Sequence, residues 1–427
     1  MNQFTPEPIF HSERKLDFTV FVCILNLLCM LPGYEFAASF STLLGFSNSQ
    51  TISIPYRIFS LAVLFSACGL CLLKEIPREK ITTPMYIMFG CCVAYILKVF
   101  VNIVNEPFFL DTTRTWFFTL YAFFSAISIW ITFNKIDFKK ALPLILLMLA
   151  FVCMLKPLGF SHTADTDLLI DISRQRQSVA VGMNSISFGY AGASLCLLSL
   201  ALIFNKRIKF IWKIPAALGV ILGFYITVFS GSRSPIVVLL ICTIIFFASF
   251  FKNFVLALAG VGLLGGLAYI CKHAIVSVIA TVSQFAANRM EALIEDTGNN
   301  PHTIIAMAGW DKFKSSPILG TPTIDFTLTV SPLTGYHTAI IDALALFGII
   351  GGAFFIWIIA YAGLKTFYII RHKELYPEYW VALFAMLYLL YDIIAGGLFT
   401  IRTKDATLMM IVLVIISKTK RLFGPNA

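Results

Sequence analysis

Charge is scarce in this sequence. Only 13% of its 427 residues are Asp, Glu, Lys or Arg, whereas 59% are hydrophobic. Soluble domains carry roughly 25% charged residues, so this chain has too few charges to cover a water-facing surface. The shortage excludes a soluble enzyme, a disordered chain and a nucleic-acid-binding protein. The net charge of +10 is then better explained by membrane topology and lipid head groups than by a polyanionic partner.

Metal-binding motifs are also scarce. The sequence contains no HExxH segment and no paired Cys/His set, and Asp165-Thr166-Asp167 is its single DxD. The ten cysteines lie in or beside apolar runs, where they behave as small hydrophobic residues. We therefore expect no metal and no cofactor. No cleavable signal peptide is evident, because the first apolar run, from Phe18, is long and lacks a small-residue cleavage site.

Long apolar runs dominate the chain. A membrane-spanning helix needs roughly 20 apolar residues, and these runs lack the alternation of barrel strands. The sequence predicts an all-α polytopic membrane protein of about twelve transmembrane helices. They cover approximately 17–34, 57–73, 84–104, 114–133, 141–159, 180–204, 211–229, 235–251, 254–271, 338–362, 379–399 and 405–417.

Lys and Arg indicate the orientation of these helices. With the N-terminus inside, the Lys/Arg-rich loops alternate with the runs, so both termini are predicted to be cytoplasmic. One integral membrane domain results: nine helices in 1–271, a large outer loop at 272–336, and three helices with the C-terminus in 337–427. A loop of this length is usually functional, and we interpret it as a lid.

Several basic residues fall on the outer side, although Lys and Arg are usually concentrated in cytoplasmic loops. A ring of guanidinium groups at one depth suggests an anionic ligand, since guanidinium binds phosphate in a bidentate fork. The outer basic residues are Arg114, Arg174, Arg176, Arg233, Lys272, Arg289, Lys312, Lys314, Arg402 and Lys404.

Three segments could carry chemistry. Ser230-Gly-Ser-Arg-Ser-Pro235 combines small residues with Arg233 at a helix start, which suits a phosphate site but also suits a plain tight turn. Arg289 and Leu293 are four residues apart and share a helix face, as they would in any charged loop helix.

The third segment runs from Gly335 to Gly351. His337 caps the outer end of a predicted helix, Asp342 follows five residues later, and the glycines let another helix come close. A histidine pKa near ~6.5 suits proton transfer, although a single histidine at a helix end is more often structural. His302, which opens a loop helix, is a further candidate ligand contact.

Together these features resemble the bacterial O-antigen polymerase and O-antigen ligase superfamily. The resemblance rests on the late outer loop, the 230–235 turn, Arg289 with Leu293, and His337 followed by Gly348 and Gly351. Asn184-Ser-Ile-Ser-Phe-Gly189, after Arg174 and Arg176, and Pro317-Ile-Leu-Gly320 also look like family segments. The resemblance covers roughly 174–352.

The chain departs from the family pattern at three points. His302 stands where relatives often have Arg, Thr-Pro follows Gly320 in place of a second glycine, and Thr338 follows His337 where ligase-like members often have Asn. His-Thr with Asp342 looks closer to the polymerase branch.

The resemblance implies a metal-independent, inverting glycosyltransferase of the GT-C type in the bacterial inner membrane, active on the periplasmic face. Its donor would be an undecaprenyl-pyrophosphate-linked glycan, and a chain-length regulator protein is a candidate partner. His337 is the expected general base. Arg233, Arg289, Arg176 and Arg174, with Asn184, His302 and Asp342, are the expected substrate and pyrophosphate ligands.

Three alternatives stay open. An O-antigen ligase would use the same donor site and transfer the glycan to lipid A-core. A polysaccharide transporter would fit the helix count, but transporters usually show two related halves and midplane ionisable groups, and the spans offer chiefly Lys98 and Asp392. An assembly subunit without activity would leave the outer arginines unexplained.

Overall fold

The fold is described from a computed structural model. It describes residues 17–46, 49–105, 110–160, 162–163, 177–178, 183–205, 208–250, 256, 259–260, 262–263, 266–267, 270–282, 284, 287–288, 291, 301–321, 338–373, 376 and 378–423.

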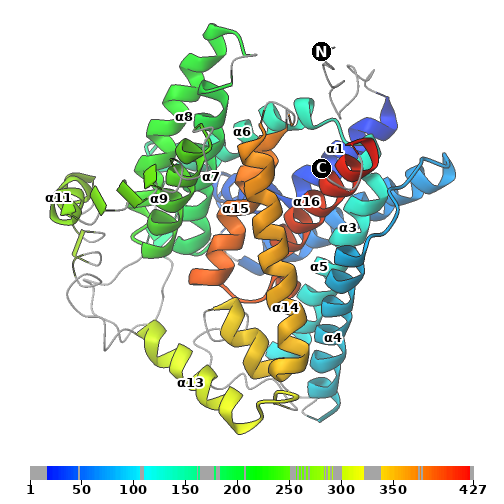
Figure 1. The fold of residues 1–427 in the computed structure, drawn as a ribbon. Helices are drawn as coiled ribbons and strands as arrows, with labels where there is room; N and C mark the ends of the chain where they lie inside the picture. Colours follow the sequence, from blue (N-terminus) through cyan, green and yellow to red (C-terminus); the bar gives the residue numbers. More distant parts are fainter. Residues whose placement is uncertain are drawn as a thin grey trace. The chain divides into compact units, whose positions relative to one another are not determined.

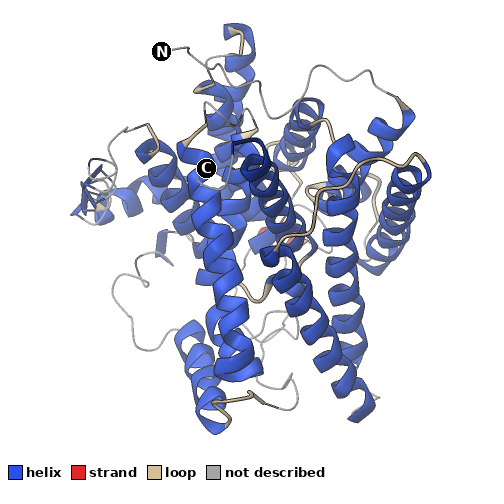
Figure 2. Ribbon diagram, turned by 45° about the vertical axis from the view of Figure 1, so that its right-hand side comes forward, coloured by secondary structure: helices blue, strands red, loops and turns tan. Residues whose placement is uncertain are grey.

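Most of these residues are helical, and the described strands are one antiparallel pair of two residues each (Figure 2). The elements are α1 Phe18–Met30, α2 Gly33–Leu43, α3 Ser49–Leu73, α4 Thr83–Asn105, α5 Leu110–Thr132, η1 Phe133–Lys135, α6 Phe138–Met154, β1 His162–Thr163, β2 Gln177–Ser178, α7 Ser185–Ile203, α8 Phe210–Phe229, α9 Arg233–Ala248, α11 Lys272–Val282, α13 Pro301–Ser315, α14 Ala339–Arg371, α15 Tyr379–Ile394, η3 Phe399–Ile401 and α16 Thr403–Phe423. The antiparallel pair β1 and β2 matches His162 with Ser178.

The helices confirm a polytopic, all-α membrane protein. Six helices of the described ranges are long and apolar enough to cross a membrane, in α3, α4, α5, α7, α8 and α14. The pair α1 and α2, bent by 77°, would make a seventh if it is one span. The predicted spans at 141–159, 235–251, 379–399 and 405–417 also form helices, and that at 254–271 falls largely outside the described residues.

The chain forms two compact units that interleave along the sequence. One consists of Met1–Cys23, Leu64–Ile136 and Gly298–Ala427, and the other of Ile24–Val63 and Asp137–Thr297. The predicted boundaries at 272 and 336 mark the ends of the outer loop in the membrane topology, whereas these two units are defined by contacts within the fold. The predicted boundaries therefore stay a prediction.

In the unit that contains residues 137–297, α7 is the central helix. It packs against α6, α8 and α9, and its small residues let α8 approach closely. A Cβ on Gly223 would lie 2.5 Å from the backbone nitrogen of Cys196, and one on Gly192 would lie 2.8 Å from the Gly223 carbonyl oxygen. Small residues at such crossings are typical of membrane helices, whose association depends on close van der Waals packing.

In the other unit, α14 and α16 make most of the contacts. Figure 1 shows α14 beside α4 and α15, with α13 crossing near its N-terminal end. The helix α16 packs on α5 and α15 and is almost entirely buried from Ala406 to Ile416. This burial explains why the apolar run at 405–417 contains so few polar residues.

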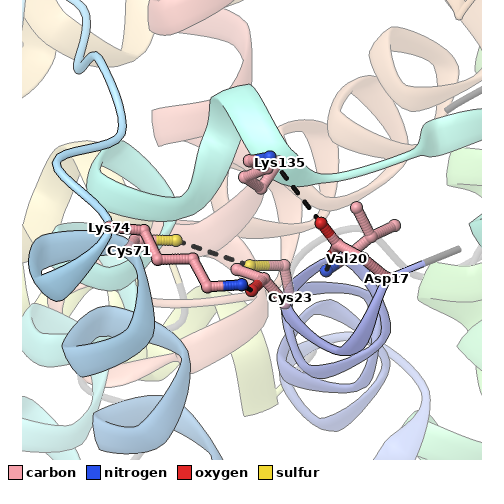
Figure 3. Close-up of polar contacts among 7 residues, drawn as sticks. Asp17, Val20, Cys23, Cys71, Lys74 and Lys135 are labelled. Atoms are coloured by element: carbon pink, nitrogen blue, oxygen red, sulfur yellow. Dashed lines mark hydrogen bonds and ion pairs between the residues drawn. The ribbon is translucent and has the colours of Figure 1, made fainter. Parts of the chain in front are cut away.

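Charged groups gather where α1 begins (Figure 3). The Asp17 carboxylate accepts the backbone N–H of Val20 at 2.7 Å and lies 4.0 Å from the Lys135 ammonium. Lys74 donates to the hydroxyl of Thr19 at 2.7 Å. The unit thus brings two loops that were predicted to be cytoplasmic, those with Lys74 and Lys135, to the start of the first helix.

The cysteines behave as packing residues. Nine of the ten are buried thiols, and Cys271 is exposed. The Cys23 and Cys71 sulfur atoms lie 3.6 Å apart between α1 and α3 (Figure 3). Cys71 is therefore paired with Cys23, and not with its CxxC neighbour Cys68.

We predict that Gly223→Leu destabilises the α7–α8 pair. The added side chain meets the Cys196 backbone, and such overpacking costs about 1–3 kcal/mol. Thermal unfolding of the detergent-purified protein, followed by near-ultraviolet circular dichroism, measures the loss. The control is Gly363→Leu on α14, where a Cβ meets nothing within 4 Å. Equal unfolding temperatures for the two variants would contradict the close packing.

Asp17 should stabilise the protein in a pH-dependent way. The Val20 N–H, followed by the charges of Lys135 and Lys74, holds the pKa of Asp17 below its usual value of 3.8. The stabilisation is therefore complete above the unfolded pKa and is lost as the pH falls through the lower folded pKa. Asp17→Ala should lower the free energy of unfolding by about 1 kcal/mol at neutral pH. The difference should begin to shrink near about pH 4 and should disappear only once the pH is below the lowered folded pKa. Denaturant titrations in mixed micelles at both pH values test this, and a difference that stays constant refutes it.

Candidate functional site

The structure describes only some of the predicted site residues. Arg233, Asn184 and Asp342 are described in full, and His302 is described only as part of helix α13. The other four lie outside the described residues: His337, Arg289, Arg174 and Arg176. The described ones belong to two clusters, one in each unit.

The first cluster begins at the start of α7. Asn184 precedes this helix in extended conformation, and its side-chain oxygen accepts the backbone N–H of Ser187 at 2.7 Å. Asparagine is among the best residues for such a cap. The structure thus gives Asn184 a capping role. Two other residues of the family-like segment 184–189, Ser185 and Gly189, contact the turn between α8 and α9.

That turn is the Ser230–Pro235 segment, and hydrogen bonds of its own serines hold its conformation. Gly231 adopts a positive φ of 66°, which only glycine tolerates easily. The Ser230 hydroxyl donates to the Thr227 carbonyl at 2.9 Å and accepts the N–H of Ser232 at 3.3 Å. The Ser232 and Ser185 hydroxyls lie 3.1 Å apart and join the turn to α7.

Gly189 completes the contact between the two segments. A Cβ on this residue would lie 2.6 Å from the Ser230 hydroxyl and 2.7 Å from Pro235 Cγ. Only a glycine lets the turn sit this close to α7. The structure therefore brings together two segments, 184–189 and 230–235, that are more than 40 residues apart in sequence.

Arg233 is the first residue of α9, and its side chain is partly buried. The first turn of a helix exposes backbone N–H groups and carries a partial positive charge. The guanidinium therefore adds to a field that already favours an anion. This arrangement can hold a phosphate, and the rigid turn fixes the position of the Arg233 backbone.

The second cluster is built around a break in α14. Gly348 has φ 61° and ψ −163° inside the helix, a region that is essentially restricted to glycine. The break frees backbone groups, and the segment after α13 satisfies them. The N–H of Ile349 donates to the Pro317 carbonyl at 2.8 Å, and the N–H of Thr321 donates to the Ala345 carbonyl at 3.0 Å.

The role expected for Gly348 is thereby corrected. It is the Pro317–Gly320 segment, and not another helix, that approaches Gly348. A Cβ on Gly348 would collide with the Ile318 carbonyl, and one on Gly320 would collide with that of Leu346. Lys98 of α4 also donates to the Leu346 carbonyl. An intimate backbone contact thus joins two family-like segments.

Asp342 lies in the first turn of α14 and is 2% exposed. Thr338 caps the same helix, since its hydroxyl accepts the N–H of Ile341 at 3.1 Å. An acidic group near a helix N-terminus is stabilised by the helix dipole. Asp342 is thus buried one helical turn after Thr338, whose carbonyl accepts its backbone N–H. Stabilisation of the α14 N-terminus explains this burial as well as a substrate contact does.

Sequence reasoning missed a buried charge cluster. Arg402 Nη1 contacts Asp392 Oδ1 at 3.0 Å, and its Nε lies 4.0 Å from Asp405 Oδ2. The two carboxyl groups are 1% and 3% exposed. Arg402 is therefore engaged by carboxylates and is not presented to an anion as part of an outer ring. The three-residue spacing of Arg402, just before α16, and Asp405 in its first turn was the signal that could have indicated their pairing.

No family model matches this chain, and no curated protein does. In the parts of the chain that the structure describes, no three His, Cys, Asp or Glu side chains come together as a metal site. The two clusters therefore have to be interpreted from their own geometry and from the sequence motifs.

We predict that Arg402→Leu is strongly destabilising. It leaves two buried carboxyl groups without their guanidinium, and breaking a buried ion pair in this way typically costs about 3–5 kcal/mol. The matched variant Asp405→Asn keeps the shorter Arg402–Asp392 contact and should cost far less. Protein abundance in membranes and the unfolding temperature in detergent measure both. Wild-type values for Arg402→Leu would show that the cluster does not stabilise the fold.

Proposed function

We propose that this chain is an O-antigen polymerase. In this proposal it joins undecaprenyl-pyrophosphate-linked oligosaccharide repeats on the periplasmic face of the bacterial inner membrane, as a metal-independent, inverting glycosyltransferase. Both termini are cytoplasmic, about twelve helices span the bilayer in a GT-C-type arrangement, and the loop at 272–336 covers the outer end.

One observation carries the proposal: Arg233 begins a helix on a turn that is locked against the Asn184–Gly189 segment. Both segments resemble the superfamily, and their contact makes a rigid base for a cation at a helix N-terminus. The contact of Pro317–Gly320 with Gly348 adds support, because it joins two further family-like segments.

The chemistry follows from the donor. No ATP is present outside the cytoplasmic membrane, so the energy for the new glycosidic bond must already lie in the sugar–pyrophosphate bond. Negative charge grows on the pyrophosphate as that bond breaks. Arg233, Arg289 and Arg176 would stabilise it, and electrostatic stabilisation of this kind is usually the largest single catalytic effect.

The acceptor is a sugar hydroxyl of a second lipid-linked repeat. His337 would take the proton of this hydroxyl as its oxygen attacks the anomeric carbon. Direct attack from the side opposite the pyrophosphate inverts the configuration at that carbon. Asp342, five residues further along the chain, is buried in the first turn of α14.

Substitution of the cation and of the base tests this function. In nanodiscs without divalent metal, with an undecaprenyl-pyrophosphate-linked repeat as the only substrate, we expect Arg233→Ala to slow chain extension about 10²–10³-fold. His337→Ala should slow it about 10²–10⁴-fold. Mass spectrometry of the lipid-linked products gives the rates.

The matched control is Arg78→Ala. The Arg78 guanidinium lies over the Trp130 ring at 5.6 Å, in a loop that is predicted to be cytoplasmic, so extension should continue. Unchanged extension by both the Arg233 and the His337 variants would defeat the proposed mechanism.

A deletion strain separates polymerase from ligase. Loss of a polymerase leaves a single repeat on lipid A-core, whereas loss of a ligase leaves long glycan on the lipid carrier. Lipid extraction followed by gel analysis distinguishes them. Glycan transport that survives His337→Ala would favour a transporter instead.

A further inference from the structure

The turn after α13 exposes two large aliphatic side chains. Ile318 and Leu319 are 62% and 73% exposed, although the helix before them packs on α14. They belong to the same compact unit as α4, α13 and α14. In the sequence they fall in the predicted outer loop, which water would surround. Adjacent exposed apolar side chains of this size indicate a contact outside the chain.

The apolar surface of this turn continues onto α14. The Pro317 carbonyl accepts the N–H of Ile349 at 2.8 Å. The Ile318 carbonyl accepts that of Ile350 at 3.3 Å. Ile349 and Ile350 are themselves 57% and 56% exposed, and α14 is long and apolar enough to cross a membrane. The turn is therefore hydrogen-bonded to exposed residues of a membrane-spanning helix.

The length of α14 after its break places this turn near the edge of the bilayer core. Lys365 and Arg371 follow Gly348 by 17 and 23 residues, which is about 26 and 35 Å of helix. The hydrocarbon core is about 30 Å thick. Since the cations at the ends of a spanning helix lie at the head groups, Gly348 and the turn beside it lie close to the opposite edge of the core.

Helix α4 gives a second count of this depth. It begins at Thr83, after Lys80, which is predicted to be cytoplasmic. Lys98 lies 15 residues after Thr83, which is about 22 Å of helix, and it donates to the Leu346 carbonyl just before the break in α14. With the predicted orientation, both counts place the break in the outer part of the bilayer.

The backbone of the turn tolerates an apolar surrounding. The Gly320 N–H donates to the Ser316 carbonyl at 3.0 Å, and the Ser316 hydroxyl donates to the Gly320 carbonyl at 2.7 Å. Pro317 has no N–H to satisfy. Because lipid cannot hydrogen-bond exposed backbone groups, this internal pairing is what a turn at the membrane boundary requires.

The residues before the turn are typical of a membrane interface. Trp310 is exposed, and its ring centre lies 5.0 Å from that of Phe313. Lys314 contacts Asp311 at 3.1 Å, but its side chain is still 61% exposed and can reach a phosphate. Tryptophan is enriched at the level of the lipid head groups, and lysine extends its ammonium to that level from apolar surroundings.

We propose that the Pro317–Leu319 turn inserts into the outer leaflet and binds the acyl chains of bilayer lipid. Ile318 and Leu319 enter the hydrocarbon, while Trp310 and Lys314 lie at the level of the head groups. The outer loop is thereby anchored in the membrane at this turn and is not surrounded by water along its whole length. This interaction surface is separate from the proposed sugar transfer and does not depend on it.

Spin labels at the turn test the insertion. Leu319→Cys and, separately, Ile318→Cys are combined with Cys271→Ser, which removes the exposed native thiol, since the other nine cysteines are buried. Each nitroxide-labelled protein is reconstituted in nanodiscs of phosphatidylethanolamine and phosphatidylglycerol. Power-saturation electron paramagnetic resonance then measures how often the label collides with oxygen, which dissolves in hydrocarbon, and with a water-soluble nickel chelate.

Two reference positions accompany the turn. Phe354→Cys labels an exposed residue of α14 on the membrane side of Gly348, and Lys80→Cys labels an exposed loop residue. We expect the oxygen-to-nickel collision ratio at Leu319 and Ile318 to exceed that at Lys80 about tenfold, because hydrocarbon excludes the polar chelate. The ratio at Phe354 should be at least as high.

Two results would overturn the proposal. Collision ratios at Leu319 and Ile318 equal to that at Lys80 would place the turn in water. Labels that are immobile and reached by neither reagent would place the turn against protein, such as a second copy of this chain. Neither result changes the expected effect of Arg233→Ala on chain extension, so the membrane anchor and the proposed function can fail separately.

Discussion

The structure depends on how backbone polar groups are satisfied where helices break. In an apolar, membrane-spanning chain no water replaces a lost helical hydrogen bond, so each break needs a partner within the protein. At Gly348 the partner is the 317–321 segment, whose carbonyl and N–H groups pair with those freed in α14. At Gly231 the Ser230 hydroxyl serves the same purpose, because it donates to the Thr227 carbonyl and accepts the N–H of Ser232.

These breaks are also where the family-like segments lie, and the same constraint explains it. A break that must be satisfied brings a second segment against it. At Gly348 glycine is required because a Cβ would collide with the Ile318 backbone, and at Gly231 it is favoured by the positive φ. The resulting contacts are rigid. Rigidity of this kind suits groups that must be held in place for catalysis, because positioning contributes much of an enzyme's rate.

The buried charges follow a related rule. A charge inside an apolar protein is costly unless it is paired, and the described charges of α4, α15 and α16 have found partners. Arg402 is held by Asp392, and Lys98 by the Leu346 carbonyl. The first pairing ties α15 to α16 and removes one arginine from those that could hold an anion. The second ties α4 to α14.

Much of the fold could be predicted because hydropathy is a local property. The runs at 57–73, 84–104, 180–204 and 211–229 form helices of membrane-spanning length, and the loop helix that His302 was expected to open is α13. The role of Gly348 could not be predicted. A glycine in an apolar helix fits a close helix contact equally well, and only the approach of Pro317–Gly320 distinguishes the two.

The sequence by itself determined that the chain is a helical membrane protein. It has too few charged residues to cover a surface that faces water, and its long apolar runs suit membrane-spanning helices. It also pointed to candidate segments for chemistry, such as the Ser230–Pro235 turn with Arg233 at a helix start. The tertiary structure decided which of these segments meet, since contacts such as Gly189 with Pro235 depend on how helices cross. It alone decided that Arg402 meets Asp392, because an ion pair between residues ten positions apart depends on spatial proximity and not on composition.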